Sequence, residues 1–329
     1  MTKETLRAMA RSLLLMLAAT GAMPVLAASD AAQTAWPQAK PITWIVGFVP
    51  GGTADLLARK AAVALGRKTG RPVMVENHPG ANGVIAMRAA AKATPDGYTI
   101  VTVAGPSLTG ERGVPRLGKE LAVVAMQAEM PMVLVGSMAT DVARLPTLKA
   151  LLDEARVRPT PWSYASSGIG GSQHLAGELL NYKAQTAIAH VPYKGGAQAA
   201  ADVVSGQVPL AILGITPVLQ HIRSGRLRAY AVTGDRRVAA SLPDVPTMQE
   251  AGVADYSARQ WYIVAAPAGV PEARVQKLHG WINEIMASPE LAKLLEDIGA
   301  NGSRETPEAV LSFAKAQDRK WKRFARAMY

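Results

Sequence analysis

The chain has no cysteine and few aromatic residues among its 329 positions. The lack of cysteine excludes disulfides, thiol nucleophiles and cysteine metal ligands, so the fold depends on packing alone. Aromatic residues make up 5% of the chain, and no stretch alternates basic residues with stacking aromatics, so we expect no nucleic-acid partner. Beyond the N-terminus, no run approaches the roughly 20 apolar residues that cross a bilayer.

The N-terminus has the pattern of an export signal. Lys3, Arg7 and Arg11 precede a short apolar run, and residues 25–27 place small side chains at a cleavage position. The pattern predicts a secretory signal peptide over residues 1–27 and a mature protein in the periplasm, with an uncleaved anchor as the alternative. The formal net charge is +11. Losing three positive residues and one negative residue with the signal leaves +9, which favours the approach of anionic ligands.

From about residue 40 the chain alternates short β-like runs with amphipathic helices, which is typical of an α/β fold. Most of the β-like runs are continuously apolar, as expected for strands that are covered on both faces. The length allows two domains, each with its own core. The expected strands are Ile42–Phe48, Val73–Glu76, Thr99–Val103, Met132–Gly136, Trp162–Ala165, Ala187–Val191, Pro209–Leu213, Leu227–Val232 and Trp261–Ala265.

Helix starts and crossings between halves are also marked. Proline follows a serine or threonine at Thr216-Pro217, Ser288-Pro289 and Thr306-Pro307, a pattern that predicts a capped helix start at each place. Two strand-like segments, Met130–Ser137 and Gln260–Ala266, can carry the chain between two halves. Two such crossings would let the halves hinge without a long linker.

Two glycine-rich loops, 48–55 and 164–172, each join a strand-like run to a helix-like run. A helix start offers unpaired backbone N–H groups and the positive end of the helix dipole, so each loop can bind an anion. Two such loops in two halves of one chain predict a cleft that closes on a small anionic ligand. The residues concerned are Gly51, Gly52, Thr53 and Asp55 in the first loop and Ser166, Ser167 and Gly168 in the second.

Simpler roles remain open for several of these residues. Thr53 or Asp55 can cap the helix that follows. Asp55 cannot itself attract a carboxylate, although it can keep the loop in shape or accept a hydrogen bond from a ligand. A third loop brings Tyr193 and Lys194 to a strand end, but Lys194 is equally well explained as solvent-exposed. A fourth, 77–83, has the proline, glycine and asparagine content of an ordinary turn.

Patterns typical of enzymes are missing from the sequence. Neither loop contains the Gly-Lys-Ser/Thr of a P-loop, and Gln173 stands where a dinucleotide fingerprint has its third glycine. No G-x-S-x-G elbow exists, and the five histidines lack H-E-x-x-H spacing. We therefore predict no catalytic residue, no metal site and no cofactor.

Eight motifs in order give the chain a resemblance to a known family, from about Lys40 to the C-terminus. The chain resembles the Bug-type extracytoplasmic solute receptors, the substrate-binding proteins of tripartite tricarboxylate transporters. One such match would be weak, but the combination is specific. The motifs are Pro50-Gly51-Gly52-Thr53-Ala54-Asp55, Glu76-Asn77-His78-Pro79-Gly80-Ala81, Pro95-Asp96-Gly97-Tyr98-Thr99, Tyr164-Ala165-Ser166-Ser167-Gly168, His174-Leu175-Ala176-Gly177-Glu178, Val191-Pro192-Tyr193-Lys194-Gly195, Leu242-Pro243-Asp244-Val245-Pro246-Thr247 and Ala266-Pro267-Ala268-Gly269-Val270-Pro271.

The resemblance implies an α/β, two-domain type II periplasmic-binding-protein fold with a ligand cleft between the domains. Domain 1 would comprise residues 28–134 and 260–329, and domain 2 residues 135–259. The protein would be a monomer that binds a small carboxylate and delivers it to membrane transporter subunits. The positions that match the family's ligand-binding loops are Gly51, Gly52, Thr53, Asp55, Ser107, Ser166, Ser167, Gly168, Tyr193, Lys194 and Gly195.

Some positions depart from the family pattern, and other functions stay open. Val49 replaces a usual proline, and His78 stands where arginine is common. The segment 110–121 is shorter than expected, with Glu111 in place of an asparagine, so the distal wall of the pocket and the ligand can differ from those of better-known members. The alternatives are a periplasmic sensor that docks on a signalling partner, or a periplasmic α/β enzyme.

Overall fold

The structure is a computed structural model that describes residues 36–106, 114–158 and 160–328. The predicted signal peptide and Ser107 lie outside the described residues, as does Glu111. From Lys40 onward the chain forms one compact unit. Within the described residues, no helix combines the length and the apolar character needed to cross a membrane.

The first five-stranded sheet has the order β2-β1-β3-β10-β4. Strand β1 pairs in parallel with both β2 and β3, whereas β10 runs antiparallel to β3 and β4. Strand β1 has the sequence ITWIV and is almost entirely buried, as its continuous apolar run predicts. The strands are β1 Ile42–Val46, β2 Val73–Asn77, β3 Thr99–Gly105, β4 Leu121–Pro131 and β10 Arg259–Pro267.

The second five-stranded sheet has the order β7-β6-β8-β5-β9. It repeats the mixed pattern of the first, because β6 is parallel to β7 and β8 while β5 is antiparallel to β8 and β9. Its strands are β5 Val133–Ser137, β6 Ser163–Ser166, β7 Ala189–Pro192, β8 Leu210–Leu213 and β9 Leu227–Val232.

The chain passes between the two sheets twice. It leaves the first sheet at the end of β4 and enters β5 after the single residue Met132, and it returns between β9 and β10. We call residues 40–131 and 259–328 lobe 1 and residues 133–258 lobe 2. The predicted domain boundaries lie close to these points, and their exact positions stay a prediction.

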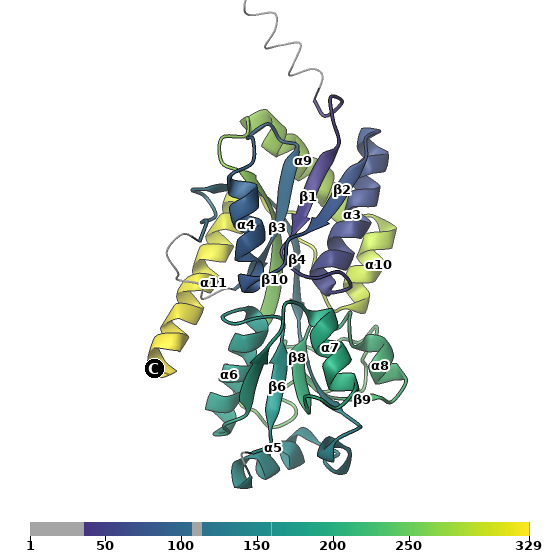
Figure 1. Ribbon diagram of the computed structural model, residues 1–329, viewed down its shortest axis with the longest axis vertical. Coiled ribbons are helices and arrows are strands. Elements are labelled where there is room, and N and C mark those ends of the chain that lie inside the picture. The colour runs from purple at the N-terminus through teal and green to yellow at the C-terminus, as the bar shows by residue number, and fades with distance from the viewer. Residues whose placement is uncertain (1–35, 107–113, 159, 329) are drawn as a thin grey trace, which may run out of the picture. The chain divides into compact units, whose positions relative to one another are not determined.

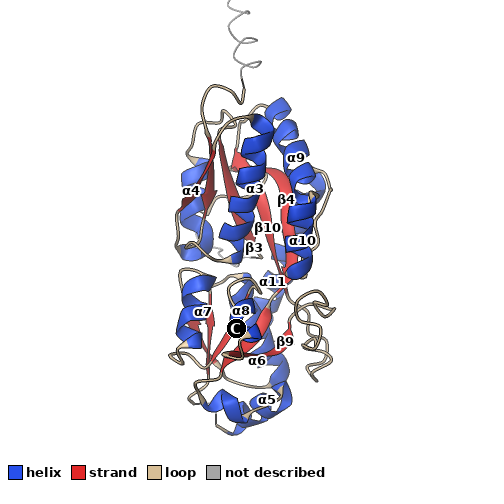
Figure 2. Ribbon diagram, turned by 90° about the vertical axis from the view of Figure 1, so that its right-hand side faces the viewer, coloured by secondary structure: helices blue, strands red, loops and turns tan. Residues whose placement is uncertain are grey.

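Helices flank the strands of both sheets (Figure 1; Figure 2). In lobe 1 these are α3 Thr53–Thr69, α4 Val84–Ala91, α9 Glu272–Met286, α10 Pro289–Asp297 and α11 Pro307–Met328, with the short 3₁₀ helix η1 Ala81–Gly83. In lobe 2 they are α5 Leu148–Val157, α6 Ser172–Ala184, α7 Gly196–Val204 and α8 Leu219–Arg223, with η2 Asp141–Arg144.

Hydrophobic clusters hold the sheets and helices together, and α11 contributes to two of those that the described residues form. Val310 and Ala314 of α11 belong to the core cluster around β3, β4 and β10. Trp321, eleven residues beyond Val310, belongs to the cluster around α5, α6 and β5, and Phe324 packs against that cluster. The Phe324 ring also meets Tyr182 of α6 edge-on, with centroids 6.0 Å apart. The last helix therefore links the cores of the two lobes.

The structure contains all nine expected strands, with ends shifted by a few residues, and differs from the expectation in two elements. Strand β4, Leu121–Pro131, was not expected. The helix expected from Thr216-Pro217 begins only at Leu219, and the Thr216 hydroxyl is buried without a hydrogen-bond partner among the described residues instead of capping it. The helices expected at Pro289 and Pro307 begin at those residues, although only Thr306 provides a side-chain cap and Ser288 does not.

Candidate functional site

The first glycine-rich loop brings the start of α3 to the boundary of the two lobes. Gly51 adopts a φ of +87°, a left-handed conformation that favours glycine. Gly52 is the N-cap residue and provides no side-chain cap. The N–H groups of the first helical turn are therefore not capped by a side chain, and the positive end of the helix dipole lies at Thr53.

Asp55 keeps this loop in shape. Its carboxylate is buried and accepts hydrogen bonds from the Gly51 N–H at 3.0 Å, from Asn77 Nδ2 at 2.8 Å and from Arg59 Nε at 3.0 and 3.1 Å. Burial by itself would raise the pKa of Asp55, but the hydrogen bonds from Arg59, Asn77 and Gly51 outweigh it and lower the pKa below its ordinary value. Asp55 is thus ionised and fully engaged by its own lobe.

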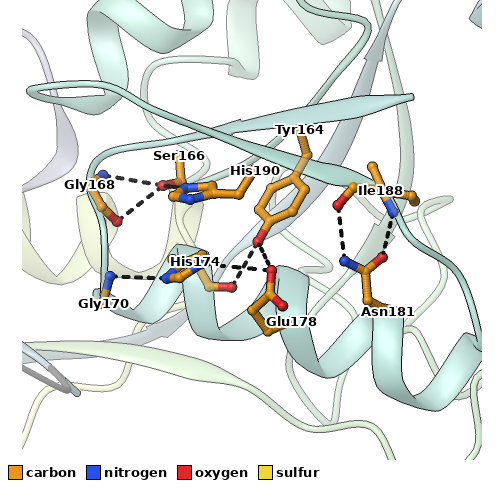
Figure 3. A network of polar contacts seen from close by, with 9 residues as sticks. All are labelled: Tyr164, Ser166, Gly168, Gly170, His174, Glu178, Asn181, Ile188 and His190. Atoms are coloured by element: carbon orange, nitrogen blue, oxygen red, sulfur yellow. Dashed lines mark hydrogen bonds and ion pairs between the residues drawn. The ribbon is translucent and has the colours of Figure 1, made fainter. Parts of the chain in front are cut away.

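The second loop is built on a polar network behind it, drawn in Figure 3. The Ser166 hydroxyl is fully buried; it accepts the Gly168 N–H at 3.2 Å and shares a hydrogen bond of 2.7 Å with His190 Nε2. The Ser167 N–H donates to Gln173 Oε1 at 2.8 Å. Ser166 therefore holds the loop in shape, whereas Ser167 borders the cavities described below.

Two stacked histidines, His174 and His190, lie beside the loop (Figure 3). Their rings are 4.0 Å apart at an angle of 22°, and His174 Nδ1 accepts the Gly170 N–H at 3.0 Å. Burial lowers the pKa of both, and the neighbouring His174 helps to lower that of His190 to about 3. Both rings are therefore neutral near pH 7, and His174 serves the structure of the loop, not acid–base chemistry.

We expect the protein to lose stability as the pH falls from about 6.5 toward 3. In the unfolded chain His190 has its ordinary pKa of 6.5, whereas the folded value is about 3. The unfolded state therefore binds the extra proton in this window, and the contribution is complete above pH 6.5. After allowance for solvent screening, we expect a loss of about 1–3 kcal/mol.

Urea denaturation of the wild type and of His190→Asn at several pH values measures this contribution. The substituted protein should show a shallower fall in the free energy of unfolding between pH 6.5 and 3. Equal slopes for the two proteins would show that His190 is not responsible.

Among the described residues, three cavities lie where loops of the two lobes meet. A small one of about 20 Å³ is lined by Gly52 and Thr53 from lobe 1 and by Ser167, Gly196 and Gly214 from lobe 2, among others. Gly196 is the first residue of α7, so two helix starts border this cavity.

The other two cavities share Phe48 and Ser167 with the first. One of about 10 Å³ is bordered by Gln260 of β10 and by Ser172. The largest, of about 680 Å³, reaches Tyr193 and Lys194. Of its lining residues that the structure describes, only Lys194 is charged, whereas Phe48 and the exposed Ile169 are apolar.

The predicted site residues are distributed unevenly over these cavities. Gly52, Thr53 and Ser167 border the smallest spaces, and Gly168, Tyr193 and Lys194 border the largest. The Tyr193 hydroxyl donates to Asp202 at 2.7 Å, and burial together with that hydrogen bond raises its pKa to about 12.

Four predicted residues line none of the three cavities among the described residues: Gly51, Asp55, Ser166 and Gly195. Gly195 is a point of close approach between lobes, because a Cβ there would lie 2.5 Å from Val49 Cγ2. Ser107 lies outside the described residues, although the preceding Pro106 borders the cavity of about 10 Å³.

Sequence reasoning missed Gln173, Gly214 and Gln260 as residues of this region. Gln173 Nε2 donates to Gln260 Oε1 at 3.3 Å, and both side chains are buried. The available signal was the glutamine that opens the strand-like segment Gln260–Ala266, since buried polar groups in a strand need partners. In the part of the chain that the structure describes, no cluster of three or more metal-binding side chains is present.

Comparisons with known proteins give a consistent result. A family model described as the tripartite tricarboxylate transporter family receptor matches residues 57–328. Protein BugT of Bordetella pertussis is 35% identical over 289 residues, which cover 86% of this chain and 87% of BugT.

Solved structures with similar folds agree. The periplasmic binding protein BugD is 30% identical, with a TM-score of 0.82 over 88% of this chain and 97% of its own. MatC from Rhodopseudomonas palustris, solved with bound malate, is 26% identical, with a TM-score of 0.80 over 86% and 98% of the two chains. A second R. palustris protein, solved with adipate, is 29% identical, with a TM-score of 0.81 over 88% and 97%.

These matches confirm the predicted two-domain periplasmic-binding-protein fold and the expectation of a solute-binding protein instead of an enzyme. The family model covers most of the chain, and the curated relative is matched along most of its own length. The chain therefore belongs to the tripartite tricarboxylate transporter receptor family, a family of periplasmic solute-binding proteins.

Proposed function

We propose that this receptor binds a small carboxylate between its lobes and delivers it to the membrane subunits of a tripartite tricarboxylate transporter. The observation that carries the proposal is the shared cavity of Thr53 and Ser167. The two residues come from the glycine-rich loops of different lobes and border the same space of about 20 Å³ at the start of α3.

The chemistry of this space suits a carboxylate. Backbone N–H groups at the start of α3 and two hydroxyl groups can donate to anionic oxygens, and the helix dipole favours negative charge. Asp55 does not oppose this, because Arg59 pairs with its carboxylate at 3.0 Å. The malate of MatC and the adipate of the second R. palustris protein, both dicarboxylates, support the same ligand class for this receptor.

Binding requires the lobes to open. Cavities of about 20 and 10 Å³ hold at most a water molecule each. The cavity of about 680 Å³ lies within the size range of small-molecule sites. We propose that the carboxylate enters beside Thr53 when the lobes separate, and that the rest of the ligand extends past Phe48 toward Lys194. A second anionic group would meet the Lys194 ammonium there.

A thermal-shift screen of the mature protein tests the ligand class. The probes are malate, adipate, citrate, benzoate and acetate, with glucose as the uncharged control. A ligand present at a hundred times its dissociation constant should add about 2.7 kcal/mol to the free energy of unfolding. Stabilisation by glucose but by no carboxylate would contradict the proposal. Delivery is tested separately, by capture of the transporter's membrane subunits on ligand-loaded receptor.

A further inference from the structure

We infer that Gln260 is a ligand-binding residue that donates a hydrogen bond from its side-chain amide to the bound carboxylate. This inference rests on the proposed function and assigns a donor outside the two glycine-rich loops. Gln260 lies on β10, and its side chain is only 2% exposed. Its Nε2 atom is buried and has no hydrogen-bond partner among the described residues.

The orientation of the Gln260 amide is fixed by its neighbours. Gln173 Oε1 accepts the Ser167 N–H at 2.8 Å, so the NH₂ group of Gln173 must face away from the Ser167 backbone. That NH₂ group donates to Gln260 Oε1 at 3.3 Å. Turning the Gln260 amide over would place two NH₂ groups against each other. Gln260 therefore presents its own NH₂ group away from Gln173.

The free NH₂ group lies beside the proposed carboxylate position. A Cβ atom built on Gly214 would be 2.5 Å from Thr53 Oγ1 and 2.9 Å from Gln260 Nε2. Both polar atoms therefore pack closely against Gly214, an approach that is possible because residue 214 has no side chain. Gly214 and Thr53 line the cavity of about 20 Å³, Gln260 lines that of about 10 Å³, and Ser167 lines both.

A carboxylate suits this space better than an apolar group. A buried donor without a partner is unfavourable, and an oxygen acceptor removes that penalty. A carboxylate has two oxygens with several acceptor positions, enough for Thr53, Ser167 and Gln260 together. A hydrocarbon segment would leave the amide unpaired. Gln260 thus favours the charged end of the ligand at this position.

Gln260→Met tests the inference, because methionine keeps the length of the side chain and removes the donor. Binding of malate and adipate, followed by calorimetry, should weaken roughly tenfold to a hundredfold. The matched control is Gln127→Met. Gln127 on β4 is also fully buried with an unpartnered Nε2, but lines none of the three cavities among the described residues. Its substitution should leave both affinities within about twofold of the wild type.

Gln260→Glu gives a readout that a merely structural residue would not produce. An ionised carboxylate introduced at this position would repel the ligand's carboxylate, whereas the protonated acid can still donate a hydrogen bond. The loss of affinity relative to the wild type should therefore grow as the pH rises from about 5 to about 8.

Wild-type affinity in Gln260→Met, or a pH-independent loss in Gln260→Glu, would overturn the role of Gln260 while leaving the receptor function intact. A wild-type protein that binds none of the carboxylate probes would overturn both.

Discussion

Replacing Thr53 and Ser167 together by alanine is expected to abolish ligand-induced stabilisation. The two hydroxyls come from opposite lobes and border the same small cavity. Each hydrogen bond to a charged group contributes about 1.5–3 kcal/mol, so losing both should weaken binding by roughly two to four orders of magnitude. Because neither residue provides a helix cap in the structure, the unliganded melting temperature should change little.

The comparison is a thermal-shift titration with malate and adipate. A control that replaces two exposed hydroxyls elsewhere, Thr94→Ala with Ser312→Ala, removes the same atoms without touching the site. The control should respond to ligand like the wild type. A double variant that retained the full ligand shift would rule out this position for the carboxylate.

Gly214→Ala is expected to weaken ligand binding by about a hundredfold or more. The added methyl group would lie 2.5 Å from Thr53 Oγ1 and 2.9 Å from Gln260 Nε2, so it would occupy the space proposed for the carboxylate. It would also separate the lobes, since Gly214 follows β8 of lobe 2 while Thr53 and Gln260 belong to lobe 1. Overpacking of this kind is unfavourable in the closed state and is relieved when the lobes open.

Two measurements follow the effect of Gly214→Ala. Calorimetry reports the affinity, and small-angle X-ray scattering reports the radius of gyration, which should be larger for the variant than for the wild type. Gly280→Ala on α9 is the control, because nothing lies within 4 Å of the added atom. That change should leave binding intact and stabilise the helix by up to about 1 kcal/mol. Normal closure and affinity in Gly214→Ala would contradict the geometry of the site.

Most of the fold could be predicted from the sequence because most of its strands are buried on both faces. Runs such as Leu227–Val232 are continuously apolar apart from a single arginine and coincide with the observed strand. Strand β4 was missed because its sequence, LAVVAMQAEMP, is rich in alanine, methionine, glutamine and glutamate, which favour helices. Its pairing with β10 overrides that local preference. Local propensity therefore fails where a tertiary partner determines the conformation.

The two loops of the site could be predicted from the sequence. Which of their residues border the cavity and which hold the loop in shape could not. The sequence indicates that 48–55 and 164–172 precede helices, and Thr53 and Ser167 do share a cavity. It does not reveal that Asp55 and Ser166 are engaged within their own lobes. That difference depends on partners such as Asn77 and His190, whose side chains only the folded chain brings into contact.

Gln260 and Gly214 could not be predicted as site residues from the sequence for a related reason. They lie on separate lobes, and neither belongs to a glycine-rich loop. Their importance appears only in the folded protein, where Gly214 has no Cβ atom and the nearby Gln260 Nε2 has no hydrogen-bond partner among the described residues. A sequence pattern records neighbours along a chain, whereas this site is defined by residues that are distant in sequence.

The last helix, α11, affects how easily the two lobes of the unliganded receptor separate. Trp321 is 3% exposed within the core of lobe 2, although the same helix begins among residues of the core of lobe 1. A rotation that separates the two lobes must either bend α11 or expose one of its ends to water. Exposing a buried tryptophan side chain costs about a few kcal/mol. A receptor truncated before Trp321 would keep every described residue of the site, but its lobes should open more readily than those of the full chain. The C-terminal half of α11 therefore shifts the equilibrium of the unliganded receptor toward the closed state.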